Sequence, residues 1–121
     1  MKLRVIELFS GVGAQRMALE RLAERHSDLE LEFVAQCDID KFAVQSYNAI
    51  HGETPNLGDI SKVEHLPQAD IVTYSYPCTS VSQAGTKKGM VEGSGTPSSL
   101  CWEVIRLIRD ARERERVVLN G

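Results

Sequence analysis

The sequence predicts an α/β domain in which about five parallel strands are flanked by helices. Short apolar runs rich in β-branched residues alternate along the chain with amphipathic segments of helical spacing. Gly, Asp or Pro residues follow the ends of these runs, as they do in turns. Strands that alternate with helices form parallel sheets with right-handed crossovers. The chain has 121 residues, which is enough for one domain and not for two, so we expect a single domain over residues 1–121.

The composition is that of a globular protein, with 42% hydrophobic and 26% charged residues. The apolar runs are too short to span a membrane, and the N-terminus lacks the pattern of a signal peptide. Cys37, Cys78 and Cys101 lie far apart and show no spacing suited to zinc, so we predict no metal site. An odd number of cysteines without a secretory signal predicts reduced thiols in the cytoplasm. The net charge of −3 argues against nucleic-acid binding by this segment alone, because such surfaces are basic.

The chain begins with a predicted strand, a glycine turn and a helix. Residues 3–9 form a short apolar run that indicates a buried parallel strand. The sequence Ser-Gly-Val-Gly at residues 10–13 interrupts this run. A helix then follows and ends at residues 27–28, because apolar residues recur at helical spacing. These apolar residues are Ala14, Met17, Ala18 and Leu22.

The same pattern repeats in the next segment. Residues 29–37 alternate and then become apolar, as expected for a second strand. A helix follows and ends at residues 51–52, and either Asp38 or Asp40 can cap its N-terminus. We expect its apolar stripe to consist of Phe42, Ala43, Tyr47 and Ile50.

Three further segments complete the predicted sheet. Residues 55–60 form a short extended piece, residues 70–74 a strand, and residues 117–119 a last buried strand. A helix precedes the last strand, with Thr96 as its N-cap and Pro97 at the first helical position. The chain stops directly after the last predicted strand, so we expect it to be truncated.

The glycine turn after the first strand has the features of half a nucleotide-binding turn. Gly11 and Gly13 allow the backbone to come close to a ligand, and a helix N-terminus favours anionic groups. The alternative is a plain tight turn. Arg16 stands where a third glycine would be needed, so a dinucleotide pyrophosphate site is not supported.

Two aspartates follow the ends of the next two extended segments. Asp38 can accept both hydroxyl protons of a ribose, and the alternative is a helix cap, for which Asp40 competes. Asp59 follows Gly58 and can accept from an adenine amino group, with Ile60 packing on the ring. Its alternative is a turn aspartate. Together with the glycine turn, the two carboxylates predict one crevice for an adenosine-containing cofactor.

Cys78 follows Pro77 at the start of a loop rich in Ser, Gly and Lys. Open α/β sheets place their chemistry in loops at the C-terminal ends of strands, so we predict that Cys78 is a nucleophile. The alternative is a buried structural thiol, which is common for free cysteines. That alternative suits Cys37 and Cys101 better, because the neighbours of Cys78 are polar.

Histidines give no support to a cysteine–histidine hydrolase. None lies near Cys78 in the sequence. We expect all three histidines at the surface or in turns: His26, His51 and His65.

Two motifs resemble those of the DNA (cytosine-5)-methyltransferases. Residues 7–14, ELFSGVGA, are similar to the family's first motif, a Phe-x-Gly-x-Gly turn for S-adenosylmethionine. Residues 77–85, PCTSVSQAG, resemble its catalytic loop, which carries Pro-Cys. The motifs occur in the family's order and spacing, and the resemblance covers nearly the whole chain. It implies the N-terminal part of the catalytic domain, with a partial Rossmann-like fold of S-adenosylmethionine-dependent methyltransferases.

The resemblance implies a set of residues that bind this cofactor. The glycine turn would contact its methionine end and its adenine face. Asp38 would hold the ribose hydroxyls, where the family more often has Glu, and Ile39 would pack on adenine. Asp59 with Ile60 would read the edge of the adenine. The complete implied set is Phe9, Ser10, Gly11, Gly13, Asp38, Ile39, Asp59, Ile60 and Pro77.

The resemblance also implies a covalent mechanism. Cys78 would attack C6 of a flipped-out cytosine, which enables C5 to take the methyl group. Pro77 would orient Cys78, and Ser82 would contact the nucleic-acid backbone. The glycine-rich segment 85–95 would close over the bound strand.

The sequence departs from the family in several places. Thr79 and Val81 replace the usual Gln and Phe, and no Glu-Asn-Val motif follows residues 117–119. The 121 residues do not include the family's later parts, which are its Arg-x-Arg motif, its target-recognition region and its last cofactor motif. We therefore expect double-stranded DNA as a partner only together with the missing region, and little or no methylation by the isolated chain. A truncated sheet also leaves an open edge, so we expect self-association or a second polypeptide.

Two alternative functions stay open at this point. One is the tRNA-methylating branch of the same fold, which resembles these enzymes in both motifs. The other is a non-catalytic fragment, or one half of a split methyltransferase. Neither alternative changes the predicted fold.

Overall fold

The computed structural model of the chain describes residues 1–75 and 100–120, with side chains up to residue 115. The chain forms two compact units. The first consists of Met1–Asp59 and Pro67–Ser75, and the second of Ile60–Leu66 and Tyr76–Gly121. No helix among the described residues is long and apolar enough to cross a membrane.

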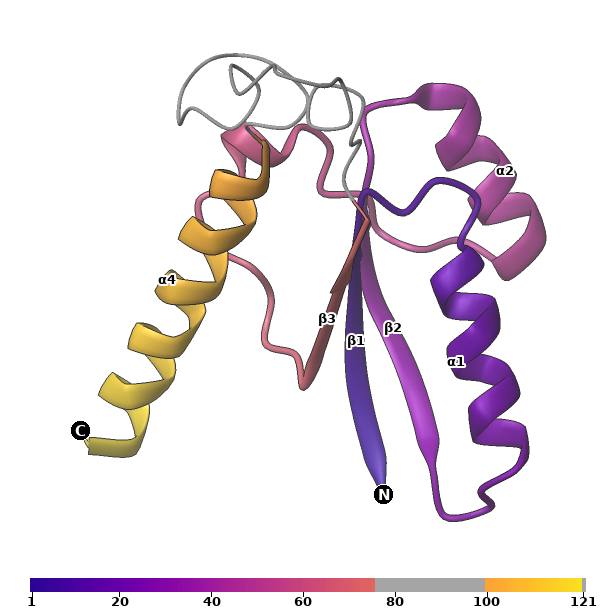
Figure 1. The fold of residues 1–121 in the computed structure, drawn as a ribbon, viewed down its shortest axis with the longest axis horizontal. Coiled ribbons are helices and arrows are strands. Elements are labelled where there is room, and N and C mark those ends of the chain that lie inside the picture. Colours follow the sequence, from indigo (N-terminus) through magenta and orange to yellow (C-terminus); the bar gives the residue numbers. More distant parts are fainter. Residues whose placement is uncertain (76–99, 121) are drawn as a thin grey trace, which may run out of the picture. The chain divides into compact units, whose positions relative to one another are not determined.

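A three-stranded parallel sheet forms the centre of the first unit (Figure 1). Strand β1 (Lys2–Leu8) lies between β2 (Glu30–Cys37) and β3 (Ile71–Tyr74). Val5 and Ile6 of β1 point to opposite faces of the sheet, and both are fully buried. Burial on both faces is typical of a central parallel strand, and it explains the continuous apolar run in this part of the sequence.

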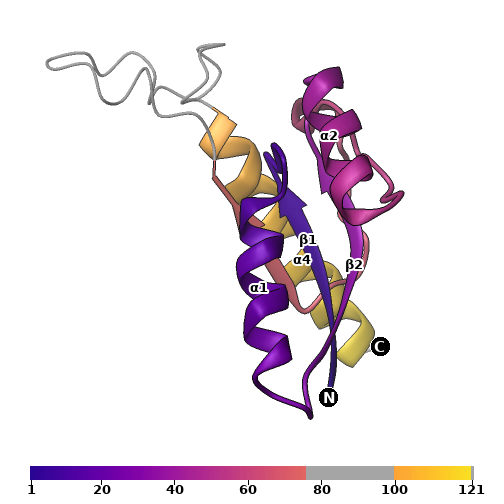
Figure 2. The same cartoon turned by 90° about the vertical axis from the view of Figure 1, so that its right-hand side faces the viewer.

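Two helices, α1 (Ala14–Glu24) and α2 (Lys41–His51), cover one face of this sheet (Figures 1 and 2). Helix α2 is capped by Asp40, whose carboxylate accepts hydrogen bonds from the backbone N–H groups of Phe42 and Ala43. The cap position therefore belongs to Asp40 and not to Asp38. Gly52 ends the helix with a φ of 91°, in the left-handed region that favours glycine.

The described part of the second unit contains the short helix η1 (Ile60–Lys62) and the long helix α4 (Leu100–Asn120). Arg106 Nη2 donates to the backbone oxygen of Ile60 at 3.2 Å. His65 Nδ1 lies 2.9 Å from Asp110 Oδ2. These side-chain contacts from α4 hold the segment 60–66 against the helix.

Two predicted strands differ in the structure. Residues 117–119 are helical, because α4 continues to Asn120. The Arg-Glu run before them consists of strong helix formers, and extending an existing helix costs less than starting a new element. The segment 55–60 makes only an isolated parallel bridge from Asn56 to Gln36. The described residues thus contain three of the five expected strands.

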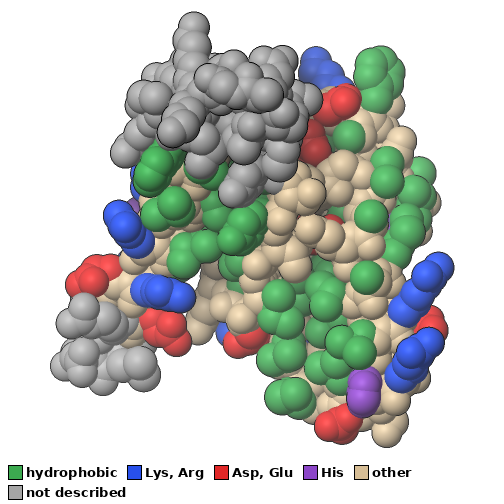
Figure 3. All heavy atoms as spheres, in the orientation of Figure 1, with side chains coloured by type: hydrophobic (Ala, Val, Ile, Leu, Met, Phe, Trp, Pro, Cys, Tyr) green, Lys and Arg blue, Asp and Glu red, His purple; other side chains and the backbone are tan. Residues whose placement is uncertain are grey.

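The predicted apolar stripe of α2 is also wrong in part. Phe42 is 79% exposed and Ile50 is 55% exposed, whereas Tyr47 is fully buried. The inward face of α2 carries Tyr47 and, one turn later, the His51 side chain, which is only 4% exposed. Polar atoms on this inward face contact Glu7 of β1 and the backbone oxygen of Val12, so hydrophobicity alone assigned the wrong face. Hydrophobic side chains accordingly lie open at the surface over α2 (Figure 3).

Candidate cofactor site

The turn between β1 and α1 has an unusual backbone conformation. Phe9, Gly11 and Gly13 have φ values of 54°, 55° and 85°, all in the left-handed region. Such a φ is uncommon for a phenylalanine, and strained residues of this kind gather at binding sites. The backbone N–H of Gly13 donates to the oxygen of Ser10 at 2.9 Å, and this bond closes the turn just before α1 starts.

A buried glutamine holds the turn against the rest of the first unit. Gln36 is fully buried at the end of β2, and its Oε1 accepts a 3.1 Å hydrogen bond from Ser10 Oγ. Its Nε2 donates to Asn48 Oδ1 at 3.0 Å and to the backbone oxygen of Thr54 at 3.2 Å. One side chain thus joins the turn, the strand end and helix α2. Both polar atoms of the Gln36 amide are hydrogen-bonded, so burying this side chain leaves no polar group without a partner.

Asp38 lies directly beside the glycine turn. Its Oδ2 accepts a hydrogen bond from the backbone N–H of Gly11 at 2.9 Å, and its Oδ1 accepts from the N–H of Asp40 at 2.9 Å. Asn56 fixes the backbone of Asp38 through two hydrogen bonds of 3.0 Å each. The structure therefore brings the first two parts of the predicted crevice together. The contact of Asp38 with a ribose stays a prediction.

Asp59 lies within electrostatic reach of the same strand end. Cys37 Sγ, at the end of β2, donates a 3.1 Å hydrogen bond to the backbone oxygen of Gly58. Burial raises the pKa of the Cys37 thiol to about 11, and the charges of Asp38 and Asp59 add to this effect. Ile60, the predicted partner of Asp59 on adenine, belongs to the second unit and is buried.

The groups beside the turn are of the kinds that bind an adenosine-containing ligand. A Cβ atom added at Gly11 would meet nothing within 4 Å, and the same holds at Gly58. Ile39, next to Asp38, is 73% exposed and offers an uncovered apolar surface. Carboxylates for hydroxyl or amino donors, an apolar side chain for a ring and open backbone are the groups that bind nucleosides. The residues present therefore fit S-adenosylmethionine as the resemblance implies.

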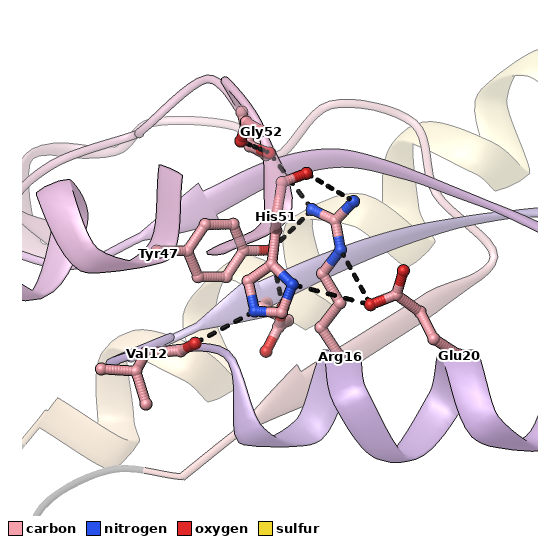
Figure 4. A network of polar contacts seen from close by, with 8 residues as sticks. Val12, Arg16, Glu20, Tyr47, His51 and Gly52 are labelled. Carbon is pink, nitrogen blue, oxygen red and sulfur yellow. Dashed lines mark hydrogen bonds and ion pairs between the residues drawn. The ribbon is translucent and has the colours of Figure 1, made fainter. Parts of the chain in front are cut away.

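A buried polar cluster lies behind the turn, and the sequence analysis missed it (Figure 4). Tyr47 donates a 2.7 Å hydrogen bond to Glu7 Oε1, and Arg16 Nη1 lies 3.3 Å from the Tyr47 hydroxyl. The Arg16 guanidinium also lies 4.2 Å over the ring of Phe33 and contacts Thr54 Oγ1 at 3.2 Å. Burial raises the pKa of Glu7 above its usual 4.5, although the bond from Tyr47 opposes this shift. Glu7 within the apolar run of residues 3–9 could have indicated this cluster, because a buried charged residue needs a partner.

Other predicted residues have different outcomes. Cys37 and Cys101 are buried free thiols, as expected. His51 is not a surface residue, because its side chain is 4% exposed and contacts the glycine turn. The predicted catalytic residues lie outside the described residues, so their roles stay predictions: Pro77, Cys78 and Ser82.

Comparison with known proteins identifies relatives among methyltransferases. The chain is 40% identical over 98% of its length to the orphan methyltransferase M.Rho11sI of Bacillus phage rho11s. It is 36% identical over 99% of its length to the type II methyltransferase M.BanI of Aneurinibacillus aneurinilyticus. The chain spans only 23% and 27% of these two relatives.

A solved structure and a family model also match the chain. A solved structure of a Spodoptera frugiperda DNMT2 mutant matches 84% of this chain and 30% of its own, with a TM-score of 0.59 and 25% identity. The family model for C-5 cytosine-specific DNA methylase matches residues 3–114. This match covers most of the chain and includes the turn, Asp38 and the first part of helix α4. The chain therefore belongs to the C-5 cytosine-specific DNA methylase family.

Proposed function

We propose that this chain is the cofactor-binding and nucleophile-bearing part of a DNA cytosine-5 methyltransferase that uses S-adenosylmethionine. The observation that carries the proposal is the 2.9 Å hydrogen bond between Gly11 N–H and the Asp38 carboxylate. It joins two strand ends at a point where the backbone of Gly11 faces open space. Family membership and the names of the phage and type II relatives support DNA as the substrate.

The residues around the turn would divide the work of binding. Asp38 would accept from the ribose hydroxyls, Ile39 would cover one face of the adenine, and Asp59 would accept from its amino group. Phe9, Ser10, Gly11 and Gly13 would line the methionine end with backbone, and Ile60 and Pro77 complete the set. The cofactor, when bound, supplies a methyl group on a positively charged sulfur.

Cys78 would supply the nucleophile. Its thiolate would add to C6 of a flipped-out cytosine, which makes C5 electron-rich enough to take the methyl group. Loss of the C5 proton would then allow Cys78 to leave and would restore the ring. Pro77 would orient the thiolate, and Ser82 would contact the nucleic-acid backbone. The sequence of 121 residues has no Glu-Asn-Val motif to assist at the base, so we expect little or no methyl transfer by this chain alone.

Cofactor binding is tested with two matched isoleucines. Ile39 and Ile50 are 73% and 55% exposed, so replacing either one with Ala disturbs packing little. Binding of S-adenosylhomocysteine is measured by calorimetry. We expect Ile39→Ala to weaken binding and Ile50→Ala to leave it unchanged. Equal affinities for the two variants would contradict the proposed adenine contact.

The nucleophile and the substrate are tested by trapping. The chain is incubated with S-adenosylmethionine and either duplex DNA containing 5-fluorocytosine or a tRNA with the same substitution. We expect a low yield of covalent adduct with the DNA, because the chain lacks the target-recognition region, and we expect this adduct to disappear in Cys78→Ser. An adduct that survives in Cys78→Ser would refute the role of Cys78, and one with tRNA alone would favour the tRNA-methylating alternative. No adduct from a chain that binds the cofactor would favour a non-catalytic fragment.

A further inference from the structure

The imidazole of His51 lies against the glycine turn, although His51 is the last residue of α2. Its Nε2 is 3.0 Å from the backbone oxygen of Val12. A carbonyl oxygen can only accept, so Nε2 carries the proton and donates. The contact therefore holds the peptide group between Val12 and Gly13 from the side of α2.

The ring of His51 is fixed on its other sides as well (Figure 4). The centroids of the His51 and Tyr47 rings are 4.7 Å apart, and the two planes are inclined by 58°. His51 Nδ1 lies 3.6 Å from Glu20 Oε1, and the same oxygen lies 3.5 Å from Arg16 Nε. A buried side chain that is hydrogen-bonded at Nε2 and packed against a ring at its face has little freedom to move.

The turn is shaped to accept this ring. A Cβ atom at Gly13 would lie 2.4 Å from His51 Nε2, 2.8 Å from its Cδ2 and 2.9 Å from Tyr47 Cε2. Real Cβ atoms do not approach other atoms so closely, and the φ of Gly13 is 85°. Position 13 therefore requires glycine for two reasons: its backbone has a positive φ, and the ring of His51 occupies the space that a Cβ atom would need. Gly11 differs, because a Cβ there would meet nothing.

We propose that His51 is a positioning residue for the cofactor turn. It would act through the carbonyl of Val12, which keeps Gly11 and Gly13 in the conformation that presents their backbone to the ligand. This inference rests on the proposed function, because it assigns His51 to the cofactor-binding turn. His51 itself would not touch the cofactor.

The test compares three single variants of the chain. His51→Ala removes the donor, and His51→Gln restores an N–H group that can reach Val12. His26→Ala removes an exposed histidine and serves as the control. We measure the affinity for S-adenosylhomocysteine by calorimetry and the hydrogen exchange of the Gly13 amide by NMR.

We expect His51→Ala to weaken binding about 3- to 10-fold, the effect of one lost hydrogen bond. The Gly13 amide, which is bonded to the Ser10 oxygen, should exchange faster in this variant. His51→Gln should recover most of the affinity, and His26→Ala should behave as the parent chain. Unchanged binding and unchanged Gly13 exchange in His51→Ala would overturn the proposal.

A general stability role would give a different result. In that case, amides throughout β1 and α2 would exchange faster together with Gly13, and His51→Gln would not recover binding; this also overturns the proposal. If His51→Ala fails to fold, His51→Gln decides: affinity and Gly13 exchange close to those of the parent chain would support the proposal, and weak binding with fast Gly13 exchange would overturn it. Failure of the parent chain to bind S-adenosylhomocysteine would count against the proposed function. Hydrogen exchange of the Gly13 amide in His51→Ala would still show whether His51 holds the turn.

Discussion

The hydroxyl of Tyr47 donates a 2.7 Å hydrogen bond to Oε1 of Glu7, and both side chains are fully buried. Burial raises the pKa of Tyr47 to about 12, so its hydroxyl keeps its proton and remains a donor. The other carboxyl oxygen of Glu7 is buried and has no hydrogen-bond partner among the residues that the structure describes. The bond from Tyr47 is therefore the main compensation for burying this carboxyl group.

Removing the Tyr47 hydroxyl should destabilise the fold. Tyr47→Phe leaves Glu7 Oε1 without its donor, which costs about 1–3 kcal/mol for a buried polar group. Urea unfolding measures the change in the free energy of unfolding. Tyr74→Phe is the control, because Tyr74 is 46% exposed and water can replace a lost contact. Equal effects of the two substitutions would contradict the role given to the Tyr47–Glu7 bond.

Glu7 should make stability fall as the pH rises. Its pKa is raised in the folded state above the usual value of 4.5, so the folded chain binds this proton more tightly than the unfolded chain. Its contribution is then fully present below about pH 4.5 and is lost as the pH rises through the folded pKa. Glu7→Gln removes this titration, so parent stability relative to Glu7→Gln should decrease with rising pH. If the difference in the free energy of unfolding between the parent chain and Glu7→Gln does not change with pH, the raised pKa of Glu7 is contradicted.

Gly11 and Gly52 offer a matched pair for the ligand site. Both have a positive φ, and a Cβ atom at either position would meet nothing within 4 Å. Ala at position 11 should cost about 1–2 kcal/mol of conformational energy. Ala at position 52 should cost more, because a φ of 91° with a ψ of 164° is open essentially only to glycine. Only Gly11→Ala should weaken binding of S-adenosylhomocysteine, because its methyl group would enter the space beside Asp38. Equal binding by the two variants in calorimetry would contradict the location of the site.

Asp38 and Asp40 should separate stability from binding. Asp40→Ala removes the N-cap of α2, which should lower the free energy of unfolding by about 1 kcal/mol. Its affinity for S-adenosylhomocysteine should stay close to that of the parent chain, whereas Asp38→Ala should lose binding. Unfolding and calorimetry on both variants test this division, and a strong binding defect in Asp40→Ala would argue against it.

Cys37 should resist alkylation in the folded chain. Its thiol is 1% exposed, and its pKa of about 11 leaves little thiolate near neutral pH. Iodoacetamide labelling followed by peptide mapping should modify Cys37 only after unfolding in urea. Cys78, the proposed nucleophile, should react in the folded chain. Equal labelling rates of Cys37 with and without urea would contradict its burial.

Local patterns predicted most of the elements of the first unit. The apolar runs at residues 3–9, 29–37 and 70–74 became β1, β2 and β3 because buried parallel strands need little beyond continuous hydrophobicity. The turn residues also located the start of α1 and the end of α2. Local patterns failed at residues 117–119. The strand preference of these three residues was outweighed by the extension of helix α4.

The candidate site could be predicted only in part. The proximity of Gly11 and Asp38 follows from the parallel sheet, because the ends of parallel strands meet at one edge. The roles of Arg16 and His51 depend on how α1 and α2 pack, which periodicity does not specify. A pattern of apolar residues placed Phe42 inside, yet the buried face of α2 is held by hydrogen bonds.

The strand order β2-β1-β3 has a consequence for how this site can evolve. The chain leaves β1 towards β2 and later returns to the opposite side of β1, so β1 marks a topological switch point. In open α/β sheets the ligand crevice lies at such a switch point, whichever side chains surround it. Substitutions at Ile39 or Asp59 would then change what the crevice accepts while the crevice persists, and its position would be inherited with the topology.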